Sequence, residues 1–206
     1  MWSRQEYRNL KGEKSMIQDE TGKFWLDREK AILVVVDVQQ RLVPSMDPGI
    51  YDKVRRSIDC MVRGAELLGV PVLATEQYPK GLGPTVPELA AALTGQVIEK
   101  LSFGCCGEPT FRDHLRGLGR SQVIVTGMEA HVCVYQTVLG LLEAGYRVHL
   151  LRDAICSRGK TDYLAALQNA TSAGAVVTTT ETALFQLLRT AAAPEFKAVS
   201  ALIKGR

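Results

Sequence analysis

The chain has 206 residues and a formal net charge of +3; 46% of its residues are hydrophobic, 23% charged and 6% aromatic. This length and composition suit one folded domain with a full core and exclude disorder over most of the chain. The longest uninterrupted apolar run near the amino terminus, at residues 31–36, is far shorter than the roughly 20 residues of a membrane span, so no membrane partner is expected. Basic residues are scattered rather than gathered in a stripe, so no nucleic acid partner is expected either.

The amino terminus, the cysteines and the histidines indicate a cytoplasmic protein without a metal. Residues 1–30 mix both charges and contain no apolar segment typical of a secretion signal. The cysteine count is odd, which favours a reducing compartment; the five cysteines are Cys60, Cys105, Cys106, Cys133 and Cys156. No two of the three histidines lie at metal-ligand spacing, so we expect no metal and no other cofactor.

Residues 1–28 form a polar arm or extension that mixes both charges and shows little periodicity. Two interpretations stay open for it. Either Met16 is the true start and the preceding residues are an extension, or the segment is a short ordered arm that covers a neighbouring part of the protein. From residue 29 to residue 206 we expect a single domain, with no internal repeat and no linker.

Strand and helix patterns alternate along this domain. The run at 31–37 is rich in β-branched residues, as in a strand buried on both faces, and Asp47 and Pro48 supply a helix N-cap and a first-turn proline. The strands expected are 31–37, 71–75, 96–99, 122–126, 147–151 and 175–178, and the main helices expected are 49–68, 109–118, 132–144, 161–173, 181–188 and 195–203. This alternation predicts an α/β fold with a parallel sheet and helices on both faces. A closed barrel needs roughly 250 residues, so a three-layer α/β/α sandwich fits better.

Three reactive side chains follow three of the expected strands. Asp37 follows the first strand, Lys100 the third, and Cys133 the turn after the fourth. Because open parallel sheets bind ligands at the carboxyl ends of their strands, we expect a carboxylate, an ammonium and a thiol at one edge. Each alone has an ordinary structural explanation: an Asp caps loops, a lysine faces solvent, and a cysteine fills a core.

Cys133 is the candidate nucleophile of this group. It lies where a helix begins, and the helix dipole favours an anion there by about 0.3–1 kcal/mol. A nearby ammonium would add to this, so we expect the pKa of Cys133 to lie below the usual value and the thiolate to be well populated. Asp37 would then take the thiol proton and pass it to the leaving group, with Lys100 holding the charged pair in place.

Three motifs in this order resemble the isochorismatase-like cysteine hydrolases. They are AILVVVDVQQRL from residue 31, EKLSFG from residue 99, and VTGMEAHVCVYQTVLGLLEAGYRVHLLRDAICSR from residue 125; the segment TEQYPKGLGPTVPEL from residue 75 is typical of isochorismatase-domain-containing proteins. The resemblance covers about residues 26–190. It implies a Rossmann-like sheet with six parallel strands in the order 3-2-1-4-5-6, and it implies that Asp37, Lys100 and Cys133 form a catalytic triad.

The same resemblance implies the geometry around the nucleophile. It places a cis peptide bond between Met128 and Glu129, and it implies that the backbone N–H groups of Glu129 and Cys133 form an oxyanion hole. Metal-dependent relatives carry a histidine between the first two triad members, but this chain has no histidine between Asp37 and Lys100. We therefore expect a metal-independent cysteine hydrolase that cleaves a small amide, ureide or ester through a thioester on Cys133.

Two other functions stay open beside this hydrolase. Isochorismatase proper cleaves a vinyl ether without a thiol nucleophile, so an activity of that type would not need Cys133. A member of the family without catalytic activity would serve as an oligomeric binding module. A third hypothesis, a redox pair at Cys105 and Cys106, competes with a structural role for these small residues in a tight loop.

Substrate-pocket candidates follow the first, second, third and fourth strands; they are Gln39, Gln40, Tyr78, Phe103 and His131. Gln39 and Gln40 would orient the substrate or satisfy loop backbone, and Tyr78 or Phe103 would form an apolar wall. His131 would line the pocket rather than act as the base, because residues two apart in a turn diverge. The partner expected is a small-molecule substrate, and the apolar helices at the carboxyl terminus suggest a homo-oligomer, a dimer or larger.

Overall fold

The computed structural model describes residues 21–93 and 95–206. Of the arm predicted at residues 1–28, residues 1–20 therefore lie outside the described part. Its last residues pack against the domain: Leu26 is fully buried, and its N–H donates to Gln186 Oε1 at 2.9 Å. The side chain of Gln122 adds a second anchor, because its Nε2 donates to the Trp25 carbonyl at 2.8 Å.

A six-stranded sheet with the strand order β3-β2-β1-β4-β5-β6 forms the centre of the molecule, and each strand runs parallel to its neighbours. The strands are β1 (Ala31–Val36), β2 (Val72–Gln77), β3 (Gln96–Lys100), β4 (Gln122–Met128), β5 (Arg147–Cys156) and β6 (Val176–Thr178). This confirms the predicted fold class and strand order. The order reverses between β1 and β4, which places the topological switch point there.

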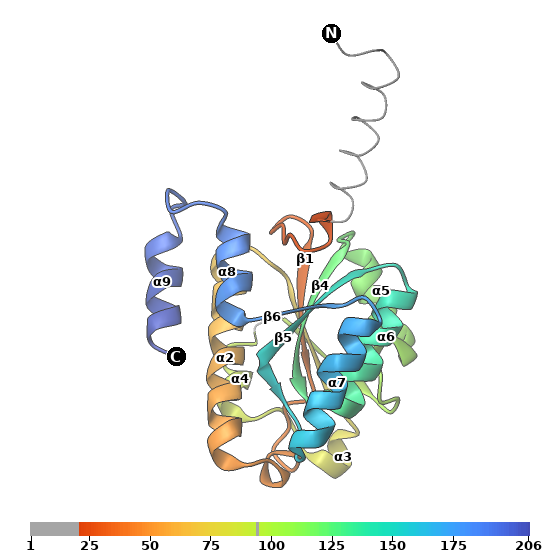
Figure 1. Cartoon of the computed structure of the whole chain (residues 1–206). Helices are drawn as coiled ribbons and strands as arrows, with labels where there is room; N and C mark the ends of the chain where they lie inside the picture. Colours follow the sequence, from red (N-terminus) through yellow and green to blue (C-terminus); the bar gives the residue numbers. More distant parts are fainter. Residues whose placement is uncertain (1–20, 94) are drawn as a thin grey trace, which may run out of the picture.

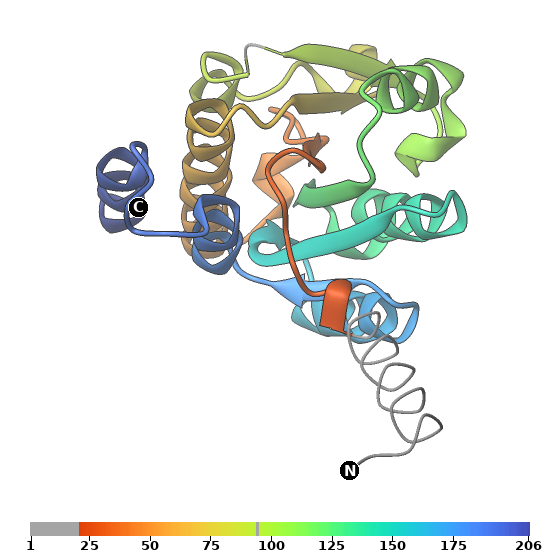
Figure 2. The ribbon, with the colours of Figure 1, turned by 90° about the horizontal axis from the view of Figure 1, so that it is seen from above.

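Helices cover both faces of the sheet, as Figures 1 and 2 show. α2 (Pro48–Leu67), α8 (Thr180–Leu188) and α9 (Phe196–Lys204) lie on one face, and α5 (Pro109–Gly117), α6 (Tyr135–Glu143) and α7 (Lys160–Ser172) on the other. Short elements complete the chain: η1 (Val43–Ser45), α3 (Pro79–Leu82), α4 (Pro87–Ala90), η2 (Cys105–Gly107) and the π-helical turn η3 (Ala130–Val134). Among the described residues, no helix has the length and apolar character needed to cross a membrane.

β1 divides the interior into two cores because its side chains alternate between the faces of the sheet. Leu33 and Val35 pack with α2 and α8 in one core, and Ile32 and Val34 pack with α5 and α6 in the other. Every residue of β1 is buried. The continuous β-branched run in the sequence follows from this burial on both faces.

Gly127 allows β1 and β4 to approach closely at the switch point. It pairs with Val36, and a Cβ at this position would lie 2.0 Å from the Val36 carbonyl oxygen. Its φ of +116° is also unfavourable for any other residue. This glycine therefore sets the spacing of the two strands whose ends carry Asp37 and the nucleophile turn.

β5 is longer than predicted because a bulge interrupts its regular pattern. Leu150 pairs with Val125 and Ile155 with Gly127, so β5 advances five residues while β4 advances two. The bulged residues break the alternation from which a strand is recognised. The predicted strand ended at residue 151 for this reason, whereas β5 continues to Cys156.

Candidate active site

The three predicted catalytic residues lie at the carboxyl ends of their strands and are all buried. Asp37 follows β1, Lys100 ends β3, and Cys133 lies in η3 after β4. The exposed fractions of these residues are 0%, 3% and 6%. The electrostatics of the cluster therefore act with little screening by solvent.

Lys100 and Asp37 form a fully buried ion pair. Lys100 Nζ lies 2.6 Å from Asp37 Oδ2, and neither side chain is exposed. The ammonium also donates to Gln77 Oε1 at 2.8 Å and to the Phe103 carbonyl at 2.8 Å, with the Ser102 carbonyl at 3.1 Å. These partners fix the ammonium, which reaches Asp37 across the intervening strand β2.

Asp37 is held from the side of β2 as well. Thr75 Oγ1 donates to Asp37 Oδ1 at 2.7 Å, whereas Oδ2 makes no hydrogen bond of normal geometry within the described residues and depends on the ammonium. The backbone of Asp37 has a φ of +49°, in the left-handed region that non-glycine residues seldom adopt. Such a conformation persists where the surrounding structure imposes it, and it often occurs at functional sites.

The environment of the Cys133 thiol favours its protonated form. Burial raises the pKa of Cys133 to about 12; the Asp37 carboxylate adds to the rise, and the Lys100 ammonium opposes it. The prediction of a lowered pKa is therefore wrong for this state. A helix terminus contributes only about 0.3–1 kcal/mol, which cannot offset the removal of a thiolate from water beside a carboxylate.

The turn that carries the nucleophile is fixed through its backbone. The N–H groups of Val132 and Val134 both donate to the Glu129 carbonyl, at 3.1 and 3.2 Å, and Thr137 Oγ1 donates to the Cys133 carbonyl at 2.6 Å. The peptide bond between Met128 and Glu129 is cis. π-Helical turns of this kind are frequent at functional sites.

An ion pair that the sequence analysis did not identify anchors the same turn. The buried Glu129 carboxylate accepts hydrogen bonds from Arg158 Nε at 3.0 Å, Nη2 at 2.5 Å and the backbone N–H at 3.1 Å. Although burial acts to raise it, these bonds hold the pKa of Glu129 below its usual value. The sequence did offer a signal for this ion pair. Ser157 and Arg158 directly follow β5, so they lie at the same edge of the sheet as the predicted site.

The two glutamines after β1 have different environments. Gln39 is fully buried; its Nε2 donates to the carbonyls of Gln77 and Gly83, and its Oε1 accepts from the Gln77 N–H. Gln39 thus satisfies loop backbone, one of its two predicted roles. Gln40 is exposed. Gln77, which was not singled out, links this loop to the ammonium of Lys100 through its own side chain.

The aromatic candidates are exposed near the cluster. Tyr78 is 50% exposed, Phe103 is 54% exposed, and Leu101 beside it is 75% exposed. We call these three residues the apolar rim. His131 is half-buried, and its Nδ1 lies 3.0 Å from Ser157 Oγ.

A second thiol lies beside the cluster. Cys105 is fully buried, with Sγ 3.7 Å from Thr75 Oγ1, and its N–H donates to Thr137 Oγ1 at 3.0 Å. Burial raises the pKa of Cys105 to about 12. All five cysteines are free thiols in the structure, Cys105 and Cys106 included. No group of three potential metal-ligating side chains occurs in residues 21–93 and 95–206.

The switch point of a doubly wound sheet, with a buried carboxylate, ammonium and thiol around it, defines the class: an α/β protein with its reactive groups at the strand ends. An isochorismatase domain model matches residues 31–182. The chain therefore belongs to the isochorismatase family, and it is an isochorismatase-family hydrolase.

Individual relatives agree with this assignment. The chain is 40% identical over 180 residues to isochorismatase domain-containing protein 2A of Mus musculus, covering 85% of this chain and 84% of that one. A Caenorhabditis elegans structure described as MAR1 ribonuclease is 38% identical with a TM-score of 0.79, covering 87% and 92%. The Escherichia coli YcaC gene product, described as an octameric hydrolase of unknown specificity, has the same fold at 24% identity and a TM-score of 0.81, covering 87% and 89%.

Proposed function

We propose that the protein is a metal-independent cysteine hydrolase that cleaves a small amide, ureide or ester through a thioester on Cys133. One observation carries this proposal: the fully buried pair of Lys100 and Asp37, 2.6 Å apart, next to a thiol whose pKa responds to both charges. Such an arrangement supplies a nucleophile, a proton acceptor and a fixed positive charge within one site.

The raised pKa of the thiol determines the order of events. With a pKa of about 12, ionising Cys133 at pH 7 before attack would cost about 7 kcal/mol. Proton transfer is therefore coupled to bond formation: Cys133 Sγ attacks the carbonyl carbon while its proton passes to the Asp37 carboxylate. The N–H groups of Glu129 and Cys133 would hold the developing oxyanion.

Asp37 then acts twice as a proton carrier. As the carbon–nitrogen or carbon–oxygen bond breaks, protonated Asp37 donates its proton to the leaving group and the thioester remains on Cys133. Water enters, Asp37 takes one of its protons, and the hydroxide adds to the thioester carbonyl. Collapse of this intermediate releases the acid, and the Cys133 thiolate takes the proton back from Asp37.

Lys100 stabilises the Asp37 carboxylate between these steps. Its ammonium is positioned by Gln77 and by two backbone carbonyls, which hold it beside Asp37 Oδ2. A fixed charge in a buried site stabilises the anionic base without reorganisation during the reaction.

The substrate class follows from the thiol and the walls of the site. A vinyl ether hydrolase would have no use for a nucleophile at Cys133, which favours acyl substrates. We propose that the apolar rim of Tyr78, Leu101 and Phe103, which is exposed in this structure, contacts the substrate as it enters the site. We propose that a second copy of the chain assembles with this one, as a dimer or larger, in the cytoplasm, and YcaC is a precedent for assembly in this fold.

The decisive experiment is a hydrolysis screen of small amides, ureides and esters, with intact-mass detection of a thioester. Wild type should turn over at least one substrate and carry its acyl group on Cys133. Cys133→Ala should lose activity by a factor of about 10³ or more while it keeps the fold. Cys60→Ala, which removes another buried thiol, is the matched control and should retain activity.

Two outcomes of this screen would reject the mechanism. Full activity in Cys133→Ala on the true substrate would favour the vinyl ether reaction. A thiol that forms no adduct with any acyl substrate, in a protein without turnover, would favour the binding module. An RNA oligonucleotide belongs in the same screen because of the description of the Caenorhabditis elegans relative.

A further inference from the structure

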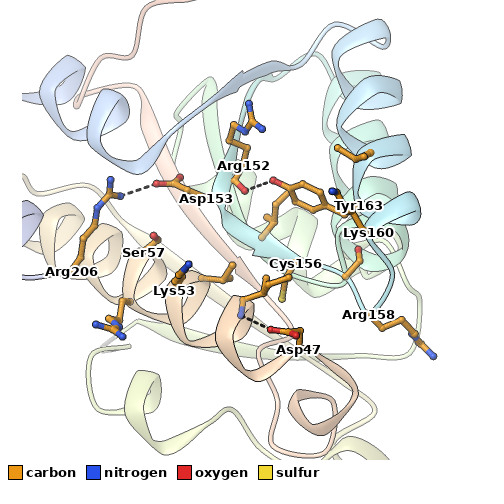
Figure 3. A pocket seen from close by; sticks show the side chains of 16 residues that line it. Asp47, Lys53, Ser57, Arg152, Asp153, Cys156, Arg158, Lys160, Tyr163 and Arg206 are labelled. Atoms are coloured by element: carbon orange, nitrogen blue, oxygen red, sulfur yellow. Dashed lines mark hydrogen bonds and ion pairs between the residues drawn. The ribbon is translucent and has the colours of Figure 1, made fainter.

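A large cavity lies between α2 and α7, beside the bulged end of β5. It has a volume of about 1070 Å³, at the upper end of the range for small-molecule sites. Figure 3 shows it with α2 on one side and the helix that carries Tyr163 on the other. None of Asp37, Lys100 and Cys133 lines it. The site described above therefore does not account for it.

The strand pattern explains why this space is open. β6 pairs with β5 only at His149, Leu150 and Leu151, so the rest of β5 has no strand on that side within the described residues. The bulge that follows displaces residues 152–154 from the regular ladder. α2 and α7 flank this uncovered end of the strand on its two faces.

The walls of the cavity are strongly cationic. Six lysines or arginines line it against two aspartates. Three of the cations have a carboxylate partner: Arg56 pairs with Asp52, Arg158 with Glu129, and Arg206 with Asp153. The aspartates of the wall are also committed, because Asp47 caps α2 and Asp153 binds Arg206.

The other three cations are free of such partners. Lys53 on α2, Arg152 on β5 and Lys160 at the start of α7 are exposed, and none forms an ion pair or side-chain hydrogen bond within the described part of the chain. They come from three separate elements, and all three belong to the lining of one cavity. Their charges have no complement within the described chain, which indicates an anionic occupant.

The floor and the rim of the same cavity are apolar. Val54, Ile155 and Cys156 are buried beneath it, while Ile50 and Leu164 are 52% and 50% exposed at its edges. Exposed side chains of this size beside a concave surface mark binding sites more often than isolated ones do. An occupant therefore gains from an apolar body as well as from a negative charge.

We propose that this cavity binds a small amphipathic organic anion, with an apolar body on the floor and a carboxylate or sulfonate head attracted by the unpaired cations of the wall. The proposal does not depend on the catalytic mechanism, because no residue of the triad lines the cavity. Ser157 and Arg158 on the wall bond to His131 and Glu129, so an occupied cavity also contacts residues that hold the nucleophile turn.

Fluorescence titration with 8-anilinonaphthalene-1-sulfonate, an apolar body with one anionic head, tests the site. Wild type should bind the probe saturably. Lys53→Glu/Arg152→Glu should weaken binding at least about tenfold, because two attractive charges become repulsive. The control Lys30→Glu/Lys197→Glu changes the net charge equally at exposed residues outside the cavity and should bind the probe as wild type does. Leu164→Gln should weaken binding through the apolar half.

Competition on the wild-type protein gives an independent measurement that needs no variant to fold. Hexanoate should displace the probe, and hexylamine, which has the same chain length and the opposite charge, should not. The proposal is overturned by any of three results: no saturable binding, equal weakening in both double variants, or equal displacement by the two competitors.

Discussion

Removing the ammonium of Lys100 should expose how much the buried pair contributes to stability. Lys100→Met keeps the length and the apolar stem of the side chain; it leaves the hydrogen bond from Thr75 Oγ1 to Asp37 Oδ1 in place but removes the cation beside Oδ2. At the observed 2.6 Å and an effective dielectric of about 20, the attraction is about 6 kcal/mol. Desolvation of both charges offsets part of this, so we expect a loss of about 3–5 kcal/mol in the free energy of unfolding at pH 7.

A double variant makes this prediction specific. Asp37→Asn/Lys100→Met should recover most of the stability, because the unpaired buried charge is removed and asparagine tolerates the φ of +49° at this position. Urea unfolding at pH 7 measures both variants. A loss below about 1 kcal/mol in Lys100→Met, or no recovery in the double variant, would contradict the buried pair.

Three further outcomes follow from single residues. The ultraviolet absorbance of the thiolate, taken as the difference from Cys133→Ser, should show that Cys133 stays protonated through pH 9, because burial raises its pKa to about 12; titration near pH 7 would refute this. Gly127→Ala should lower the free energy of unfolding by about 3 kcal/mol or more in a thermal melt, because the new Cβ would lie 2.0 Å from the β1 backbone. The control is Gly145→Ala, which has a φ of +84° but open space around it. It should lower the free energy of unfolding by only about 1–2 kcal/mol. Gln39→Ala should lower the free energy of unfolding by about 3 kcal/mol, because it leaves buried backbone groups without hydrogen-bond partners. Gln40→Ala, at an exposed residue, should leave the stability unchanged. Equal effects of the two substitutions would show that the loop does not depend on the Gln39 amide.

Most of the fold could be predicted because its central strands, β1 and β4, are buried on both faces. The run at residues 31–36 is apolar throughout, which distinguishes a central parallel strand from an amphipathic one. The end of β5 could not be predicted in this way. Its bulge mixes Arg152 and Asp153 into the strand, so neither a continuous apolar run nor an alternation marks it.

The positions of the reactive groups were predictable, but their electrostatics were not. Strand ends of a parallel sheet share an edge, so Asp37 and Lys100 were expected to meet there, and they lie 2.6 Å apart. Whether the pKa of Cys133 is raised or lowered depends on how much water reaches the sulfur. The depth of burial of one side chain cannot be read from the sequence. The roles of Thr75 and Gln77 as supports of the pair were not predicted, because strand residues that face a site resemble those that satisfy a core.

The reactive cluster takes its members from β1, β3 and the turn after β4, with β2 supplying the contacts between them. These groups lie far apart in the chain and meet at the sheet edge. We therefore expect the Cys133 sulfur to become fully shielded only once these strands have docked side by side. During refolding, the moment at which this sulfur stops reacting with an alkylating reagent would serve as a clock for completion of the central sheet, readable without any knowledge of the natural substrate.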